Sequence, residues 1–179
     1  MIKKLPSVKF NVRVRDESIG GDNPFKWQEM DTSDYFSDKK VILFSLPGAF
    51  TPTCSTYQLP DFNKLYTEFK QLGIDEIYCL SVNDSFVMNA WAKHHDIGNV
   101  KVIPDGNGEF TRKMGMLVKK ENLTFGMRSW RYAAIIDNCQ ITQTFIEEGF
   151  KDNAEDDPYE KSSPQNILSY LKEINKVAV

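Results

Sequence analysis

Residues 41–60 read VILFSLPGAFTPTCSTYQLP, and this stretch contains two different local patterns. Its beginning, VILFS, is a continuous apolar run of the length expected for a strand buried on both faces. Further along, Thr51 suits a helix N-cap, and Pro52 suits the first helical position, where a missing N–H costs nothing. The stretch therefore predicts a buried strand that leads through a short loop into a helix, with Cys54 in the first helical turn.

Strand and helix patterns alternate on both sides of this stretch. Further strands are expected at residues 8–14, 77–82, 100–103 and 132–136, and a hairpin partner of the last one at residues 141–146. Helical patterns lie between the strands, and the polar residues 152–163 are expected to form a loop. This order of elements predicts an α/β three-layer sandwich around a mixed sheet, in a single domain over residues 1–179.

Three of the expected helices carry predictions about their ends and inner faces. The helix after Cys54 should be kinked by Pro60 and should end at Gly73. Asp84 should cap a second helix, and Ser163 with Pro164 should open the last one. The expected inward residues of these two helices are Phe86, Val87, Ala90 and Trp91 in the second and Ile167, Leu168, Leu171 and Ile174 in the last.

Composition excludes several classes of protein. The net charge of −3 gives no basic footprint for nucleic-acid binding, and no apolar run is long enough to cross a bilayer. The N-terminal residues have no apolar stretch behind their lysines, so we expect no secretory signal and a cytoplasmic location. The three cysteines, Cys54, Cys79 and Cys139, are at least 25 residues apart, which argues against a disulfide framework or a zinc ribbon. Nor can the adjacent His94 and His95 easily share a metal, because neighbouring side chains on a helix diverge.

Cys54 has two interpretations from the residues alone. A lone cysteine is most often a small buried hydrophobe. In the first turn of a helix, however, free backbone N–H groups and the positive end of the helix dipole favour a thiolate, which is the nucleophilic form of cysteine. Its place directly after a buried strand is a recurrent site for reactive groups in α/β folds, so both interpretations stand.

The loop around Cys54 resembles the active-site loop of the peroxiredoxins. Their signature is proline, three residues, threonine, two residues and cysteine, and Pro47, Thr51 and Cys54 match it. Four further segments resemble the atypical fifth subfamily, which includes type II enzymes and bacterial peroxiredoxin–glutaredoxin fusions. These segments are CLSVND (79–84), FVMNAW (86–91), PDGNGEFTRKMGMLV (104–118) and FGMRSWRY (125–132). The resemblance covers most of the chain up to about residue 150 and implies a thioredoxin-like fold.

The same resemblance implies roles for particular residues in a thiol peroxidase. Cys54 would attack hydrogen peroxide or an alkyl hydroperoxide and become a sulfenic acid, with no metal or prosthetic group. Pro47 would shield the loop from water, and Arg131 would keep Cys54 ionised. The residues expected to contact the peroxide are Gly48, Thr51, Arg128 and Arg131.

The sequence also carries predictions about how Cys54 is regenerated. Relatives that resolve their own sulfenic acid carry a second cysteine near the last helix, where this chain has Ser162 and Ser163. A one-cysteine route is therefore expected, with glutathione, alone or with a separate glutaredoxin, as first choice of reductant and thioredoxin as second. Cys79 is expected to be an inert packed thiol, and Cys139 stays open as an unusual resolving residue. The resemblance also implies a homodimer that packs near the active-site loops.

Two other functions fit parts of this pattern. A dithiol–disulfide oxidoreductase shares the fold but needs a second cysteine three residues after the first, and that position is Tyr57. A non-enzymatic redox sensor would react once with peroxide and pass its oxidation to a partner protein. Turnover separates the sensor from the peroxidase.

Overall fold

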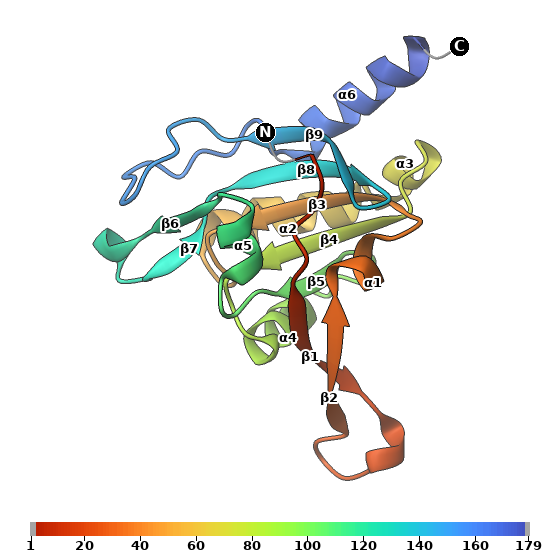
Figure 1. The fold of residues 1–179 in the computed structure, drawn as a ribbon, viewed down its shortest axis with the longest axis vertical. Coiled ribbons are helices and arrows are strands. Elements are labelled where there is room, and N and C mark those ends of the chain that lie inside the picture. The colour runs from red at the N-terminus through yellow and green to blue at the C-terminus, as the bar shows by residue number, and fades with distance from the viewer. Residues whose placement is uncertain (1–2, 178–179) are drawn as a thin grey trace.

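A five-stranded mixed sheet forms the centre of the molecule in the computed structural model, which describes residues 3–177 (Figure 1). The strand order is β5-β4-β3-β8-β9. The strands are β3 (Lys40–Leu46), β4 (Glu76–Ser81), β5 (Lys101–Pro104), β8 (Tyr132–Asp137) and β9 (Gln140–Ile146). Strands β3, β4 and β5 run parallel, whereas β8 pairs antiparallel with both β3 and β9. The predicted mixed sheet is confirmed, and its central strand is the VILFS run.

Helices cover both faces of this sheet, which confirms the three-layer sandwich. The helices are α1 (Thr32–Phe36), α2 (Leu59–Lys64), α3 (Tyr66–Gln71), α4 (Ser85–His94), α5 (Glu109–Lys113) and α6 (Pro164–Val177). Alternate residues of β3 point to opposite faces, as the pleat of a strand requires. Ile42 and Phe44 pack with α2, α3, α4 and α6, whereas Val41 and Leu43 pack with α1 and α5. Among residues 3–177, no helix has the length and apolar character needed to cross a membrane.

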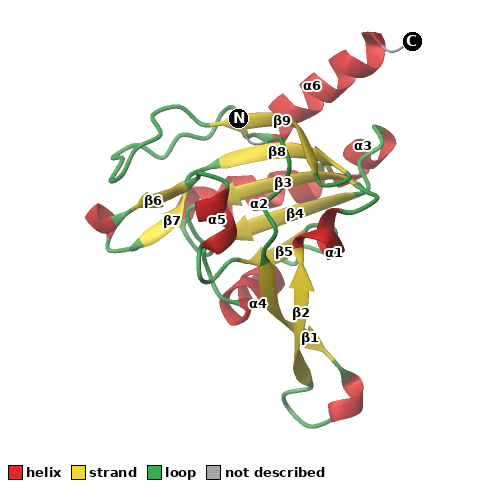
Figure 2. Cartoon of the chain, viewed as in Figure 1, coloured by secondary structure: helices red, strands yellow, loops and turns green. Residues whose placement is uncertain are grey.

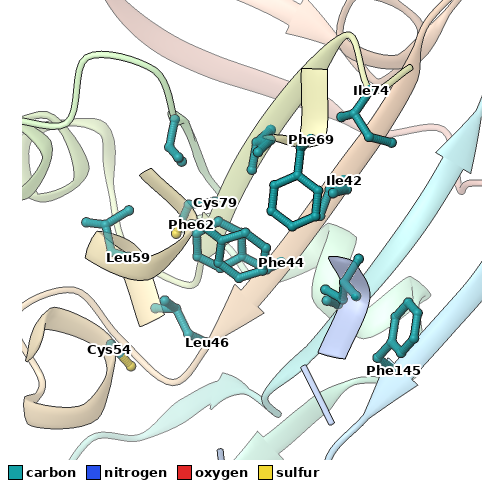
Figure 3. Packing of buried hydrophobic residues seen from close by; sticks show 14 of the residues in the cluster. Ile42, Phe44, Leu46, Cys54, Leu59, Phe62, Phe69, Ile74, Cys79 and Phe145 are labelled. Carbon is teal, nitrogen blue, oxygen red and sulfur yellow. The ribbon is translucent and has the colours of Figure 1, made fainter. Parts of the chain in front are cut away.

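The buried hydrophobic residues around Ile42 and Phe44, which we call the large cluster, are built around stacked aromatic rings. Phe44 of β3 and Phe62 of α2 lie with their ring centroids 4.0 Å apart, and both side chains are fully buried (Figure 3). Phe69 of α3 also stacks on Phe62, with ring centroids 6.2 Å apart. Cys54 lies at one end of this cluster, so the packing of α2 on β3 fixes the place of the cysteine.

Replacement of Phe62 by alanine should therefore test this packing. We expect the variant to lose about 3–5 kcal/mol of unfolding free energy, because the change removes a buried ring and leaves a cavity. Ile19, which is half exposed, provides a matched control. Urea denaturation should show Ile19→Ala within about 0.5 kcal/mol of the wild type. A Phe62→Ala loss as small as that of Ile19→Ala would contradict the packing described here.

The helix after Cys54 differs from the prediction. Residues Cys54–Gln58 form a π-helical turn, in which the N–H of Leu59 donates to the carbonyl of Cys54. This widened turn lies immediately before Pro60, where a kink was expected, and the proline cannot donate a helical hydrogen bond itself. The predicted single helix also divides into α2 and α3 at Leu65, and Gly73 follows α3 with a φ of 85°.

The inner faces of two helices also need correction. Asp84 caps α4 as predicted, by accepting from the N–H of Val87 at 3.0 Å. However, α4 buries Met88 and Trp91, whereas Phe86 and Ala90 are exposed. On α6, Ile167, Leu168 and Leu171 are buried, but Ile174 is 37% exposed because the end of the helix extends past the sheet (Figure 1).

Four strands outside the central sheet form two hairpins. The predicted first strand, β1 (Lys9–Arg15), pairs with β2 (Phe25–Asp31), which the sequence pattern did not reveal. A short hairpin of β6 (Leu117–Lys119) and β7 (Met127–Ser129) was also missed. Residues 147–163 form a long loop before α6, drawn in green in Figure 2, in agreement with the polar loop expected there.

Candidate active site

Cys54 lies where the chain leaves the central strand. β3 ends at Leu46, residues 47–51 form a loop, and helical structure starts at Pro52. The loop is fixed by the N–H of Ala49, which donates to Asn83 Oδ1 at 3.0 Å. The Cys54 side chain is fully buried beyond Leu46, at the edge of the large cluster (Figure 3). The sulfur is therefore held in one place by the strand, the loop and α2 together.

Thr51 is arranged differently from a helix cap. Its carbonyl accepts from the N–H of Ser55 at 3.0 Å, as the residue before a helix should. Its hydroxyl, however, donates to the carbonyl of Gly48 at 2.7 Å instead of accepting from the helix. The expected side-chain cap is wrong, because the loop turns back on itself and offers this carbonyl first. The donor keeps Oγ1 in the loop, with free lone pairs that can accept another hydrogen bond.

Arg131 is the charged group that reaches Cys54. It precedes β8, is 1% exposed, and places Nη1 3.4 Å from Cys54 Sγ. The same Nη1 donates to Gln58 Oε1, and Nη2 pairs with Asp157 Oδ1 at 2.6 Å. Burial works against the charged guanidinium, but Cys54 and Asp157 outweigh it and leave the pKa of Arg131 above its ordinary value. A full positive charge therefore faces the sulfur.

Two buried donors in this site have no hydrogen-bond partner among the described residues. They are Nε of Arg131 and Nε2 of Gln58. A buried donor without a partner is costly, because it loses its hydration without compensation. Both belong to residues that already converge near Cys54 Sγ, so the site has spare donors for the oxygen atoms of a bound molecule.

Arg128 supports the loop and does not bond to the sulfur. Its Nε donates to the carbonyl of Phe125 at 3.0 Å, and its Nη1 lies 3.5 Å from the carbonyl of Pro47. Burial lowers the pKa of Arg128, and a charge on Cys54 opposes this effect. A Cβ on Gly48 would meet Arg128 Nη1 at 2.9 Å, so the missing side chain of Gly48 makes room for this guanidinium.

The other two cysteines are placed unfavourably for bonding to Cys54. Cys139 lies in the turn after β8, next to the beginning of β3, because Asp137 of β8 pairs with Lys40. Cys54 follows the opposite end of β3, which has seven residues and spans roughly 20 Å. A disulfide needs Cα atoms within about 7 Å. Cys79 is fully buried in β4, and burial, together with a charge on Cys54, raises its pKa.

Gln58 and Asp157 complete the site, and sequence reasoning missed both. Gln58 is four residues after Cys54, a spacing that places two side chains on the same helical face, so a signal existed. Asp157 lies in the loop of residues 147–163, where no periodic pattern indicates which side chain turns inward.

Comparisons with known proteins agree with this geometry. The Redoxin family model matches residues 21–161. A peroxiredoxin of Rhizobium etli is 67% identical over 172 residues, which cover 96% of each chain. The chain belongs to the peroxiredoxins, in their atypical fifth subfamily. This peroxiredoxin is also 48% identical over 169 residues to the hybrid peroxiredoxin hyPrx5 of Haemophilus influenzae, covering 94% of this chain and 65% of that protein.

Solved structures of other peroxiredoxins share this fold. The Plasmodium falciparum antioxidant protein, described as a 1-Cys peroxiredoxin, superposes with a TM-score of 0.89 at 40% identity, over 97% of this chain and 99% of that one. Reduced Prx3 of Vibrio vulnificus in complex with hydrogen peroxide has a TM-score of 0.80 at 32% identity, covering 94% and 96%. As a peroxiredoxin, this protein is a thiol peroxidase that acts on peroxides and uses a thiol reductant.

Asp157 should matter for activity because it anchors Arg131. The ring of the loop residue Tyr159 also lies against Arg131, and Arg131 Cζ is 5.8 Å from the centroid of this ring. We expect Asp157→Asn to lower the second-order rate with hydrogen peroxide about tenfold, since a charge-assisted bond is lost and the carboxylate is 44% exposed. Asp156→Asn removes the same charge from the neighbouring exposed position and should stay within about twofold of the wild type. Equal rates for the two variants in stopped-flow measurements would contradict the anchoring role.

Proposed function

We propose that this peroxiredoxin reduces hydrogen peroxide and alkyl hydroperoxides through Cys54 by a one-cysteine mechanism, and that glutathione regenerates it. The observation that carries the proposal is the 3.4 Å contact between Arg131 Nη1 and Cys54 Sγ inside a buried site. A cation there favours the thiolate, and its donors can stabilise the oxygen that leaves when the O–O bond breaks.

The proposed first step transfers one oxygen atom to the sulfur. The Cys54 thiolate attacks one oxygen of the peroxide, an S–O bond forms, the O–O bond breaks, and the departing alkoxide or hydroxide takes a proton. Thr51 Oγ1 would accept from or donate to the bound peroxide, and the free donors of Arg131 would hold its oxygens. Pro47 and Gly48 would wall the pocket, while Arg128 would hold their loop in place.

The proposed second and third steps return Cys54 to the thiol. A thiol attacks the sulfenic sulfur, an S–S bond forms, and the S–O bond breaks with loss of water. A second thiol then attacks the outer sulfur and releases Cys54 and an oxidised disulfide. Two thiols are oxidised for each peroxide reduced, so the electrons balance without a metal or prosthetic group.

The one-cysteine route is supported by the placement of the remaining thiols. Cys139 lies at the far end of the sheet, and Cys79 is sealed in a strand. At the position near α6, Ser162 donates its hydroxyl to Glu147 Oε1 at 2.8 Å, which is a purely structural bond. The similar Plasmodium falciparum protein is described as a 1-Cys peroxiredoxin.

Steady-state peroxide consumption tests the choice of reductant. We expect turnover with glutathione, which added glutaredoxin accelerates, and slower turnover with thioredoxin and its reductase. Turnover with thioredoxin and its reductase but not with glutathione would overturn the glutathione proposal, while the protein would still be a peroxidase. A single stoichiometric reaction with every reductant would instead favour a redox sensor.

The proposed location of the protein is the cytoplasm. The three cysteines are all free, which supports this location.

We also propose a homodimer, because an exposed aromatic surface lies beside the active-site loop. The aromatic surface consists of Trp27, Phe50, Phe86 and His94. Trp27, Phe50 and Phe86 are each more than half exposed. The rings of Trp27 and Phe86 lie 5.7 Å apart, and those of Phe50 and His94 lie 5.9 Å apart. Phe86, Ala90 and His94 recur every four residues, so they share the exposed side of α4. Grouped apolar residues of this kind mark an interaction surface.

Sedimentation of a Phe86→Asp variant tests this surface. A charge placed in the aromatic surface should shift the protein from dimer to monomer. The control is Ile174→Asp, which alters an exposed apolar residue at the end of α6 and should leave the dimer intact. A Phe86→Asp protein with the same sedimentation coefficient as the wild type would contradict the proposed dimer surface.

A further inference from the structure

A small cavity adjoins the active-site loop. It has a volume of about 100 Å³. Pro47 and Thr51 of the active-site loop form one wall, and Lys120 and Phe125 of the β6–β7 hairpin form another. The rim carries the carboxylates of residues 155–157. One of these, Asp157, is bonded to Arg131, which contacts Cys54 Sγ, so two polar contacts connect the cavity wall to the reacting sulfur.

The walls of this cavity are tied together. The side chain of Asn153 accepts from the N–H groups of Glu121 and Asn122, at 2.8 and 3.2 Å. The N–H of Asn153 donates to the carbonyl of Lys119 at 2.8 Å, and the N–H of Lys120 donates to the carbonyl of Gly126, also at 2.8 Å. The loop of residues 147–163 and the β6–β7 hairpin lie on the same side of the sheet (Figure 1). The cavity is therefore a formed feature of the fold and does not need a rearrangement.

Lys120 is the unusual residue in this cavity. It is only 2% exposed, and its ammonium lies 5.4 Å from the ring centroid of Trp130. Within residues 3–177, no hydrogen bond or ion pair engages its Nζ. Lysine is almost never this buried unless it is paired, because an ammonium that leaves water needs a counter-charge. The aromatic ring supplies part of that compensation, but no anion does. The cavity thus presents an unneutralised cation to whatever enters it.

The charges in the cavity are mixed. The cation lies in the wall, whereas Glu155 and Asp156 are exposed at the rim and have no ion-pair partner among the described residues. A simple anion would meet these carboxylates on entry. A molecule with a carboxylate and an ammonium group could pair with both ends of the cavity, and glutathione is a thiol of this kind.

We propose that this cavity is the binding site for the thiol compound that reduces Cys54. The carboxylate of this compound would pair with Lys120, and its ammonium group would pair with Glu155 and Asp156. This inference rests on the proposed function, because it concerns the second step of that mechanism. The bound thiol is placed to attack the sulfenic sulfur of Cys54 from the side of Arg131. The S–S bond forms, the S–O bond breaks, and water leaves; the thiol is oxidised and the sulfenic acid is reduced.

Four thiols separate the two charge contacts. Glutathione carries both groups, N-acetylcysteine only the carboxylate, cysteamine only the ammonium, and 2-mercaptoethanol neither. The kcat/KM for each thiol is measured for the wild type and for Lys120→Met, which keeps the stem on Trp130 and removes the charge. The matched control is Lys119→Met, at the exposed neighbouring position. Taking the ratio of variant to wild type cancels the intrinsic reactivity of each thiol.

We expect Lys120→Met to lower kcat/KM about tenfold for glutathione and N-acetylcysteine, and less than about twofold for the other two thiols. The kcat/KM for hydrogen peroxide should not change. A double variant, Glu155→Gln with Asp156→Asn, should lower kcat/KM for glutathione and cysteamine and leave kcat/KM for N-acetylcysteine unchanged. Lys119→Met should affect none of the four thiols.

Two results would overturn the binding site. One is an equal loss with all four thiols, which would make Lys120 a structural residue. The other is a Lys120→Met protein that is indistinguishable from Lys119→Met. If the wild type turns over with 2-mercaptoethanol but not with glutathione, the glutathione proposal fails by itself. The N-acetylcysteine ratio then still decides on the cavity: a tenfold loss supports it and an unchanged ratio overturns it.

Discussion

Replacement of Cys54 by serine should reduce peroxide consumption to the rate measured without protein, a loss of at least about four orders of magnitude. A hydroxyl is a far weaker nucleophile than a thiolate, and no other thiol of the chain can take its place at Arg131 Nη1. Serine is close in size to cysteine, so the fold should persist, and circular dichroism and thermal unfolding should confirm this. The measurement is the second-order rate with hydrogen peroxide by stopped flow.

Cys139→Ser is the matched control for this experiment. Cys139 is partly exposed and lies at the other end of the sheet, where its sulfur is 3.6 Å from the hydroxyl of Ser37. The variant should keep the wild-type rate with peroxide and the wild-type turnover with glutathione. Activity that survives in Cys54→Ser would remove the central cysteine from the mechanism. Turnover that is lost in Cys139→Ser would show that Cys139 resolves the sulfenic acid after all.

Arg131→Met should produce the second-largest loss, of about two to three orders of magnitude in the rate with peroxide. Methionine fills a similar volume without charge, so the variant removes the cation and the donors while it retains the packing. Burial opposes the charge of Arg131, yet Cys54 and Asp157 hold its pKa above the ordinary value. The arginine therefore stays charged at every working pH and should add no limb of its own to the pH profile of the wild type.

The control for this variant is the neighbouring arginine. Arg128 bonds to the backbone carbonyls of Phe125 and Pro47 and not to the sulfur, so Arg128→Met should lose only about tenfold or less in rate. Alkylation of Cys54 by iodoacetamide provides a second readout, because it depends on thiolate content but not on peroxide binding. Alkylation should be slower in Arg131→Met than in Arg128→Met. Equal peroxide rates for the two variants would contradict the role given to Arg131.

Local sequence patterns predicted those helices and strands whose intrinsic preference agrees with their place in the folded protein. The apolar run of β3, the cap of α4 by Asp84 and the start of α6 at Pro164 were all found, because each depends on neighbouring residues. β2 was missed because it is exposed along most of its length and so shows no alternation. The predicted inner face of α4 was right for Val87 and Trp91 but wrong for Phe86 and Ala90, which are apolar and yet lie on the exposed side.

The candidate site also contains residues that the sequence predicted and residues that it did not. Pro47, Thr51 and Cys54 belong to one continuous stretch of sequence, and a resemblance in sequence was enough to predict that they and Arg131 lie in one site. Asp157 reaches Arg131 from a loop far along the chain, and no local rule connects the two. The π-helical turn at Cys54–Gln58 also escaped prediction, since the helical pattern does not distinguish a widened turn from a regular one.

Mass spectrometry of the protein after one equivalent of hydrogen peroxide, with and without glutathione, tests the central claim most directly. The account predicts a single added oxygen on the peptide that contains Cys54, replaced by one glutathione adduct on the same residue when the thiol is present. Oxygen found on Cys79 or Cys139 with Cys54 unmodified, or a bridge from Cys54 to Cys139, would contradict it.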